Sequence, residues 1–203
     1  MVRGALIWEG GAKAGALMQR WSRPGDTSFS VRRRSLLARA LLRRLLAEST
    51  GAQSGWTFDG ESSGRPLARR ADGGRAPAIA ISHSGGWVAC AIATVGQIGI
   101  DIEIDRPGRD ILGIAGLAFG AGERRDVERG GAGAFYRIWT AREALAKARG
   151  HGLAEAADGI DRVEGAPAAG VQLRQIGGEA WWLVHATPVE GLTLAVAYSY
   201  VTP

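Results

Sequence analysis

Residues 99–105 read GIDIEID, a strict alternation of apolar and acidic side chains. Because successive side chains of a β-strand point to opposite faces, the pattern predicts a strand with its isoleucines on one face and Asp101, Glu103 and Asp105 on the other. Carboxylates about 6.6 Å apart along one face repel each other unless water or a cation compensates their charge. Their oxygens suit a hard cation such as Mg²⁺, and the simpler alternative is an amphipathic strand with a solvated acidic face.

The sequence around this strand predicts an α+β chain. Residues 78–82 and 87–95 are typical of two strands joined by the tight turn Ser84-Gly85-Gly86, and residues 99–105 would be the third strand of that set. Leucines at helical spacing predict a helix over residues 31–48, and a second long helix is expected over residues 132–149. Shorter elements are expected as strands at 5–8, 56–58, 171–176, 180–186 and 192–201, and as helices at 111–119 and 121–128.

The length and composition limit the possible classes of protein. The chain has 203 residues, of which 46% are hydrophobic and 22% charged, as expected for one globular domain or two small packed lobes. No apolar run approaches the roughly 18 residues that span a bilayer, and the first residues do not form a secretory signal. The single cysteine, Cys90, excludes an internal disulfide. We therefore expect a cytoplasmic protein.

Charge is unevenly distributed along the chain. The formal net charge is +5, with 14 basic and 6 acidic residues in 1–97 but 11 basic and 14 acidic residues in 98–203. This asymmetry suits a protein whose first half holds phosphates and whose second half holds a cation, although a chance surface distribution is the alternative. Only Lys13 and Lys147 are lysines among 25 basic residues.

One of these two lysines lies on the second long helix. Trp139, Glu143 and Lys147 are spaced four residues apart, which places them on one helix face. An exposed Glu-Lys pair would stabilise the helix by only a few tenths of a kcal/mol and is the simple alternative to a functional site.

The segment Ile81-Ser82-His83-Ser84 lies before a glycine turn. Hydroxyls, an imidazole and glycine amides at a turn can bind phosphate oxygens, whereas an ordinary core or surface histidine is the alternative. Neither a nucleophile elbow around these serines nor a P-loop before Lys13 is present.

Together these segments resemble the larger, two-lobed (pseudo-dimeric) type of 4′-phosphopantetheinyl transferase. The resemblance extends over roughly residues 31–165 and depends on the order of its motifs more than on any one of them. The matching segments are Arg34-Ser35, Gly64-Arg65-Pro66, Ile81-Ser82-His83-Ser84, Gly99-Ile100-Asp101-Ile102-Glu103, the 139–147 helix and Gly150-His151-Gly152-Leu153. Arg142 replaces the usual lysine before the glutamate, and the first thirty residues are shorter than the family pattern.

The resemblance implies a fold and a reaction. The fold would be α+β with two similar lobes, 1–97 and 98–203, each a long helix on a small antiparallel sheet, and the active site would lie in the cleft between them. The enzyme would be Mg²⁺-dependent and would transfer the 4′-phosphopantetheine arm of coenzyme A to a serine of an acyl or peptidyl carrier protein, releasing adenosine 3′,5′-bisphosphate.

The resemblance also implies roles for individual residues. Asp101, Glu103 and Glu143 would hold Mg²⁺, and Asp101, Glu143 and Lys147 would take part in catalysis, with Glu143 accepting the serine proton. Lys147 would also contact the phosphates of coenzyme A. The other coenzyme A-binding residues would be Arg34, Ser35, Arg65, Ser82 and His83.

Partners and alternatives follow from the same resemblance. Coenzyme A and an acidic carrier protein are the expected partners of a monomer that binds neither nucleic acid nor membrane. A basic nucleic-acid-binding module is one alternative, although it leaves the carboxylates unexplained. A degenerate scaffold that binds carrier proteins without turnover is the other.

Overall fold

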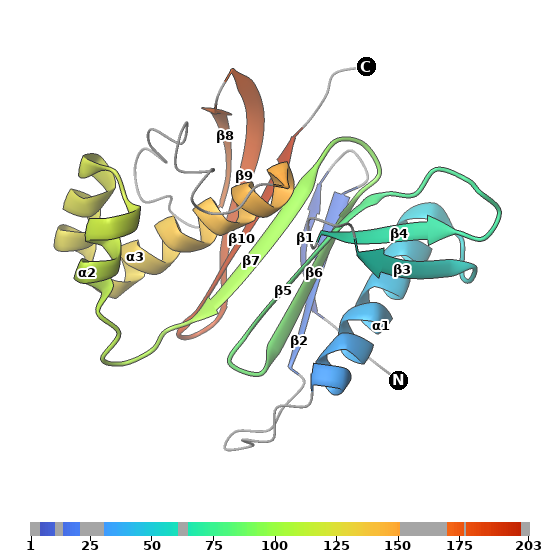
Figure 1. Ribbon diagram of the computed structural model, residues 1–203, viewed down its shortest axis with the longest axis horizontal. Coiled ribbons are helices and arrows are strands. Elements are labelled where there is room, and N and C mark those ends of the chain that lie inside the picture. Colours follow the sequence, from blue (N-terminus) through green and yellow to red (C-terminus); the bar gives the residue numbers. More distant parts are fainter. Residues whose placement is uncertain are drawn as a thin grey trace.

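The computed structural model describes residues 5–10, 14–20, 31–60, 65–150, 170–176 and 178–199. Within these ranges the chain is a mixed α/β protein of helices and antiparallel sheets (Figure 1). None of the helices in the described ranges is long and apolar enough to cross a membrane.

The first part of the chain builds one four-stranded sheet, a small hairpin and a helix. These elements are β1 (Ala5–Gly10), β2 (Ala14–Arg20), α1 (Val31–Thr50), β3 (Trp56–Gly60), β4 (Pro66–Arg70), β5 (Ala78–Ser84) and β6 (Trp87–Ala93). The sheet is antiparallel with the order β1-β2-β6-β5, and β3 pairs with β4 separately. Buried leucines of α1, including Leu41 and Leu45, pack on Val88 and Ile92 of β6.

The second part of the chain builds a second sheet and two helices. These elements are β7 (Ile98–Ile104), α2 (Ile111–Ala118), α3 (Ala121–Arg149), β8 (Gly170–Ile176), β9 (Glu179–Val189) and β10 (Leu192–Ser199). The sheet is antiparallel with the order β7-β10-β9-β8. Ala141 and Leu145 of α3 pack on Trp181 and Ala195, so α3 covers one face of this sheet.

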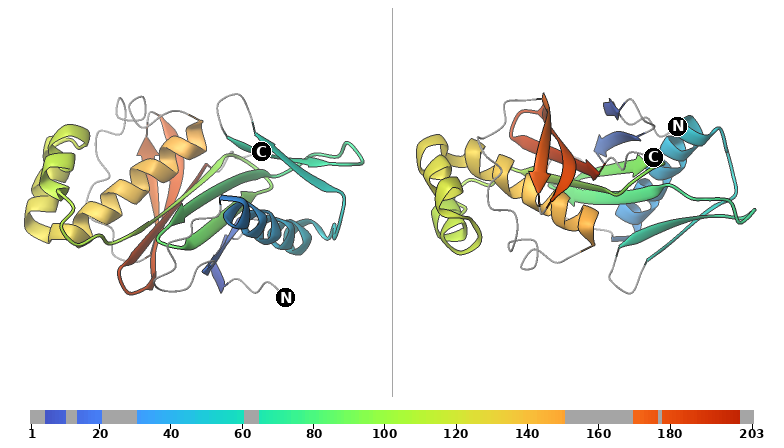
Figure 2. Two further views of the ribbon diagram at one scale, coloured as in Figure 1. Left: turned by 60° about the horizontal axis from the view of Figure 1, so that its bottom comes forward. Right: turned by 90° about the horizontal axis from the view of Figure 1, so that it is seen from above.

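A shared core joins the two sheets. Ile98, Ile100 and Ile102 of β7 pack with Ala89 and Ala91 of β6 and with residues of β2, β5, β9 and β10. The helices are therefore outermost, with α1 on one side of the two sheets and α3 on the other (Figure 1 and Figure 2).

The two sheets repeat one chain path. In the first, β2 leads to α1 and then to β5 and β6, with β6 lying between β2 and β5. In the second, β7 leads to α3 and then to β9 and β10, with β10 lying between β7 and β9. Each helix covers its own sheet, so both parts of the chain bury a helical stripe in the same way.

Several predicted elements are confirmed. The helix expected over 31–48 is α1, and the hairpin expected around Ser84-Gly85-Gly86 is β5-β6. The break expected between the helices at 121–128 and 132–149 is a kink at Gly131, whose φ of 57° is non-helical. This conformation is easily adopted by glycine because it lacks a Cβ atom.

Two predictions about strands are wrong or incomplete. Residues 99–105 are not the third strand of the β5-β6 set, because β7 pairs with β10 in the other sheet. Strands β2 and β4 were not expected at all. In β4 the residues are Pro-Leu-Ala-Arg-Arg, which lack the alternating apolar pattern and, among the described strands, pair with β3.

Candidate active site

Three residues from distant segments meet at the place where β5 runs beside β7. The Lys147 Nζ atom on α3 lies 2.6 Å from Asp101 Oδ1 on β7 and 3.3 Å from Ser82 Oγ on β5. Ser82 Oγ in turn donates a hydrogen bond of 2.8 Å to the same Asp101 oxygen. Asp101 and Ser82 are buried, whereas the Lys147 side chain is 35% exposed. The arrangement places a cation at the surface end of a buried carboxylate.

Burial and mutual repulsion perturb the carboxyl groups of this site. Burial raises the pKa of Asp101, and the neighbouring Lys147 ammonium opposes that effect. Burial also raises the pKa of Glu143, and the negative charges of Asp101 and Glu103 raise it further. The charges of Asp101 and Glu103 are therefore close enough to act on Glu143, which a solvated acidic face would not produce.

The same carboxylates have the chemistry that a magnesium ion requires. The Oδ2 atom of Asp101 is buried without a hydrogen-bond partner, so it is an acceptor that a cation could satisfy. All-oxygen ligands suit Mg²⁺, and a cation would relieve the repulsion acting on Glu143. In the described part of the chain, however, no three histidine, cysteine or acidic side chains are already gathered as a metal site. The residue types and charges fit the ion, and bringing them onto it requires side-chain movement.

The glycine at position 99 allows α3 to approach β7 closely. A Cβ atom placed on Gly99 would collide with the carbonyl oxygen of Ala144 and would lie 2.6 Å from the amide nitrogen of Ala148. The α3 backbone therefore rests directly on the strand backbone. The contacted residues Ala144 and Ala148 directly follow Glu143 and Lys147 on α3, and Gly99 lies two residues before Asp101.

Ser82 and His83 point to opposite faces of β5. Ser82 faces the shared core and Asp101, whereas His83 lines a pocket with Arg34 and Ser35 of α1. Successive side chains of a strand point to opposite faces, which places these two neighbours on different sides of β5. We expected both residues to bind coenzyme A, and the structure separates their positions.

The pocket beside α1 is basic. It has a volume of about 570 Å³, and Arg34 Nη1 lies 3.4 Å from His83 Nδ1 at its edge. Partial burial and the positive charge of Arg34 lower the pKa of His83, which favours its neutral form. An anion bound here would meet the guanidinium of Arg34 and could accept a hydrogen bond from the Ser35 hydroxyl.

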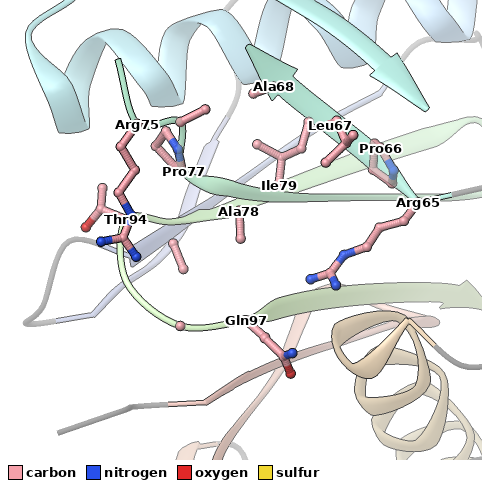
Figure 3. A pocket seen from close by; sticks show the side chains of 13 residues that line it. Arg65, Pro66, Leu67, Ala68, Arg75, Pro77, Ala78, Ile79, Thr94 and Gln97 are labelled. Carbon is pink, nitrogen blue, oxygen red and sulfur yellow. The ribbon is translucent and has the colours of Figure 1, made fainter. Parts of the chain in front are cut away.

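Arg65 lies in a different pocket, of about 310 Å³, between β4, β5 and the turn before β7. In Figure 3, Arg65 and Arg75 extend from opposite sides of this pocket, and Thr94 lies beside Arg75. The two pockets share Pro66 and Ile79 in their linings, so they are neighbours on either side of the start of β4.

Comparisons with known proteins match this chain to one family. A family model described as the 4′-phosphopantetheinyl transferase superfamily matches residues 97–197. The 4′-phosphopantetheinyl transferase HetI of Nostoc sp. is 32% identical over 173 residues, which are 82% of this chain and 70% of HetI. The chain belongs to the 4′-phosphopantetheinyl transferase superfamily.

Further relatives match shorter parts of the chain. The 4′-phosphopantetheinyl transferase AcpT of Salmonella typhimurium is 38% identical over 74 residues, covering 34% of this chain and 38% of AcpT. A 4′-phosphopantetheinyl transferase of Bacillus subtilis is 32% identical over 130 residues, covering 59% of this chain and 53% of that protein. The chain thus spans most of HetI but about half or less of these two relatives.

Arg142 is the residue at which this transferase departs from the family motif, and it holds two helices together. Its guanidinium is buried and pairs with Glu123 at 3.0 Å, and its Nη1 donates to the Ala118 carbonyl at 3.0 Å. Glu123 also accepts a hydrogen bond from the Gly120 amide at the start of α3. Arg142 therefore stabilises the junction between α2 and α3, and its side chain points away from its neighbour Glu143. The planar, multiply donating guanidinium suits this set of acceptors.

The structure brings together some of the predicted site residues and separates others. Asp101, Ser82 and Lys147 are in hydrogen-bond contact, and the charges of Asp101 and Glu103 act on Glu143. The other predicted ligands lie in the two pockets, Arg34, Ser35 and His83 in one and Arg65 in the other. The sequence suggested the Ser84 hydroxyl only as one of several possible phosphate ligands of its segment, whereas in the structure it contacts Glu103. Of the Gly150-His151-Gly152-Leu153 motif, only Gly150 lies within the described residues.

Proposed function

We infer that the protein transfers the 4′-phosphopantetheine arm of coenzyme A to a serine hydroxyl of an acyl or peptidyl carrier protein and releases adenosine 3′,5′-bisphosphate. Family membership supports the reaction. The observation that carries the assignment of this site is the contact of Lys147 with both Asp101 and Ser82, which joins residues of all three motifs. A solvated Glu-Lys pair on the surface of α3 would not require either contact.

In the proposed reaction, the serine oxygen of the carrier bonds to the phosphorus that bears the pantetheine arm. The bond from that phosphorus to the bridging oxygen of the pyrophosphate breaks, and adenosine 3′,5′-bisphosphate leaves. Glu143, whose raised pKa brings it nearer to the operating pH than an ordinary carboxylate, accepts the serine proton. Lys147 donates hydrogen bonds to the phosphate oxygens in exchange for part of its contact with Asp101.

Asp101, Glu103 and Glu143 would hold Mg²⁺, which when bound neutralises negative charge on the pyrophosphate. The unpartnered Asp101 Oδ2 atom and the mutual repulsion of the carboxylates support this assignment. The adenosine 3′-phosphate would bind beside Arg34, Ser35 and His83, where basic groups line the pocket of α1 and β5. In this arrangement residues 1–97 and 98–203 act as two lobes, and the substrate lies in the cleft between them.

The expected protein partner is an acidic carrier protein. The formal charge of +5 would favour its encounter with a monomeric enzyme in the cytoplasm. The chain aligns with 70% of HetI and with less of the other relatives. We therefore propose the class of the substrate, a carrier protein, and not one particular carrier.

Mass spectrometry of carrier proteins tests this function directly. After incubation with coenzyme A, Mg²⁺ and the enzyme, the serine of a purified apo carrier protein should gain one phosphopantetheine group, and omission of the metal should prevent the gain. Carrier binding without any mass gain across a panel of carriers would instead identify a degenerate scaffold. Tight binding of DNA or RNA that displaces the carrier would favour the nucleic-acid-binding alternative.

The two basic pockets can be distinguished with dephospho-coenzyme A, which lacks the 3′-phosphate. We expect His83→Ala to lose most of the preference for coenzyme A over dephospho-coenzyme A, because His83 and Arg34 line the proposed phosphate pocket. The measurement is the ratio of kcat/KM for the two donors. Arg75→Ala is the matched control, since Arg75 lines the neighbouring pocket rather than this one and should leave the ratio unchanged. The reverse result would place the 3′-phosphate between Arg65 and Arg75.

A further inference from the structure

Two serines of β5 contact two carboxylates of β7 in the same way. Ser82 Oγ donates to Asp101 Oδ1 at 2.8 Å and accepts a hydrogen bond from the Ile102 amide at 3.3 Å. Ser84 Oγ donates to Glu103 Oε2 at 2.8 Å and accepts from the Ile104 amide at 3.1 Å. Each hydroxyl thus uses its proton on a carboxylate and a lone pair on the next main-chain amide.

The repetition fixes the relation between the two strands. Both serine-carboxylate pairs are separated by 19 residues, so β5 and β7 run parallel at this point, with one bridge for every two residues. The strands belong to different sheets, and the serine side chains take the place that main-chain groups occupy in a ladder. Gly85 follows directly, and a Cβ atom there would lie 2.7 Å from the Ile104 side chain, so the turn after β5 also rests on β7.

We propose that Ser84 is a positioning residue of the transfer reaction, which orients the Glu103 carboxylate through its hydroxyl and fixes the strand that carries it. The proposal rests on the function proposed above, in which Ser84 had no role. Ser82 does the same for Asp101 but also contacts Lys147, so Ser84 is the member of the pair whose effect can be isolated.

The chemistry of Glu103 explains why it needs such a contact. A glutamate side chain has three rotatable bonds and, without an anchor, samples many positions. Asp101 lies two residues before it on β7 and Asp105 two residues after it, directly beyond the strand, and their negative charges would drive it away from the site. Arg106, the nearby cation, lies 3.9 Å from Glu103 Oε2 and is exposed, so its hold is weak. The buried Ser84 hydroxyl is therefore the group that keeps Glu103 beside Asp101.

Three variants of the full-length protein test the proposal. Ser84→Ala removes the hydroxyl, and Ser84→Thr keeps a hydroxyl with the β-branched shape that strands accommodate. Ser199→Ala is the matched control, because Ser199 is nearly as buried as Ser84. Its hydroxyl accepts a main-chain hydrogen bond from the Gln97 amide at 3.0 Å, at the opposite end of β7. For each variant the measurements are kcat, KM for coenzyme A, melting temperature and hydrogen exchange of the Ile104 amide.

The expected result is a fall in kcat of at least about tenfold for Ser84→Ala, with KM for coenzyme A changed less than about threefold. The Ile104 amide should exchange faster, and Ser84→Thr should restore both values. Ser199→Ala should lower the melting temperature at least as much with kcat within about twofold of the parent. A kcat within twofold for Ser84→Ala, or an equal loss in Ser199→Ala, would overturn the positioning role. The transfer activity of the parent protein, measured first, tests the proposed function separately. Hydrogen exchange of the Ile104 amide tests the Ser84 contact even if the protein is inactive.

Discussion

The replacement of Asp101 by asparagine is expected to lower turnover at least about a hundredfold while the fold stays intact. Asparagine keeps the shape of the side chain but removes the charge that pairs with Lys147 and that would bind Mg²⁺. The folded protein should tolerate this loss, because burial already disfavours the ionised carboxylate, and Lys147 is exposed enough to remain hydrated. The measurement is the rate of carrier modification by mass spectrometry, together with the melting temperature.

Asp105→Asn provides the control for this change. Asp105 follows β7 directly and is the exposed last member of the acidic row, and it has no role in the proposed reaction. Its amide variant should modify carrier protein at nearly the parental rate. If Asp101→Asn and Asp105→Asn were equally active, the acidic row would be a solvated strand face and the metal assignment would fail.

The raised pKa values give the same site a pH dependence of definite sign. Asp101 and Glu143 take up protons at higher pH than their ordinary values of 3.8 and 4.5, and protonation removes the charges that the reaction needs. As the pH is lowered, turnover should therefore begin to fall before the pH reaches the ordinary carboxyl values of 3.8 and 4.5. The folded chain holds these protons more tightly than the unfolded chain, so the contribution of the two groups to stability increases as pH falls through the same range. Activity and stability should thus change in opposite directions.

Lys147→Arg is expected to lower turnover at least about tenfold, which corresponds to roughly 1.4 kcal/mol of barrier. The ammonium contacts Asp101 and Ser82 as a compact point charge, whereas the longer, planar guanidinium would displace one of them or the phosphate. Phosphoryl transfer depends on alignment, so a displacement of about 1 Å is costly. Steady-state kinetics with coenzyme A and a carrier protein provide the measurement.

A second charge-conserving exchange provides the comparison. Arg44 forms an ordinary surface pair with Glu48 at 2.7 Å on α1, and Arg44→Lys should leave both turnover and melting temperature near the parental values. A Lys147→Arg variant that was equally silent would show that Lys147 is a surface residue whose contact with Asp101 is incidental to the reaction.

The sequence was sufficient to predict helices and hairpins because their signals are local. The leucine spacing of α1 and the glycine turn between β5 and β6 each require only a short window of sequence. The sheet to which β7 belongs could not be predicted in this way. Its partner β10 lies about ninety residues further along the chain, and pairing over such a separation leaves no mark in the strand itself.

The site was predictable in composition but only in part in its geometry. The alternation rule that placed Asp101 and Glu103 on one face applies equally to Ser82 and His83, and it separates them onto opposite faces of β5. The role of Ser84 depends on two strands from different sheets lying in parallel register, which no single segment encodes. Likewise, the position of Arg142 follows from its buried partner Glu123, nineteen residues earlier.

The close packing of α3 on β7 at Gly99 limits relative motion of the helix and the strand. Where helices and strands are separated by interleaved side chains, rotamer changes can alter their spacing by fractions of an ångström. At Gly99 the helix backbone meets the strand backbone with no side chain between them. The spacing of the α3 and β7 backbones beside Glu143, Lys147 and Asp101 is therefore fixed by main-chain contact, and any adjustment of the site to its substrates falls to the side chains.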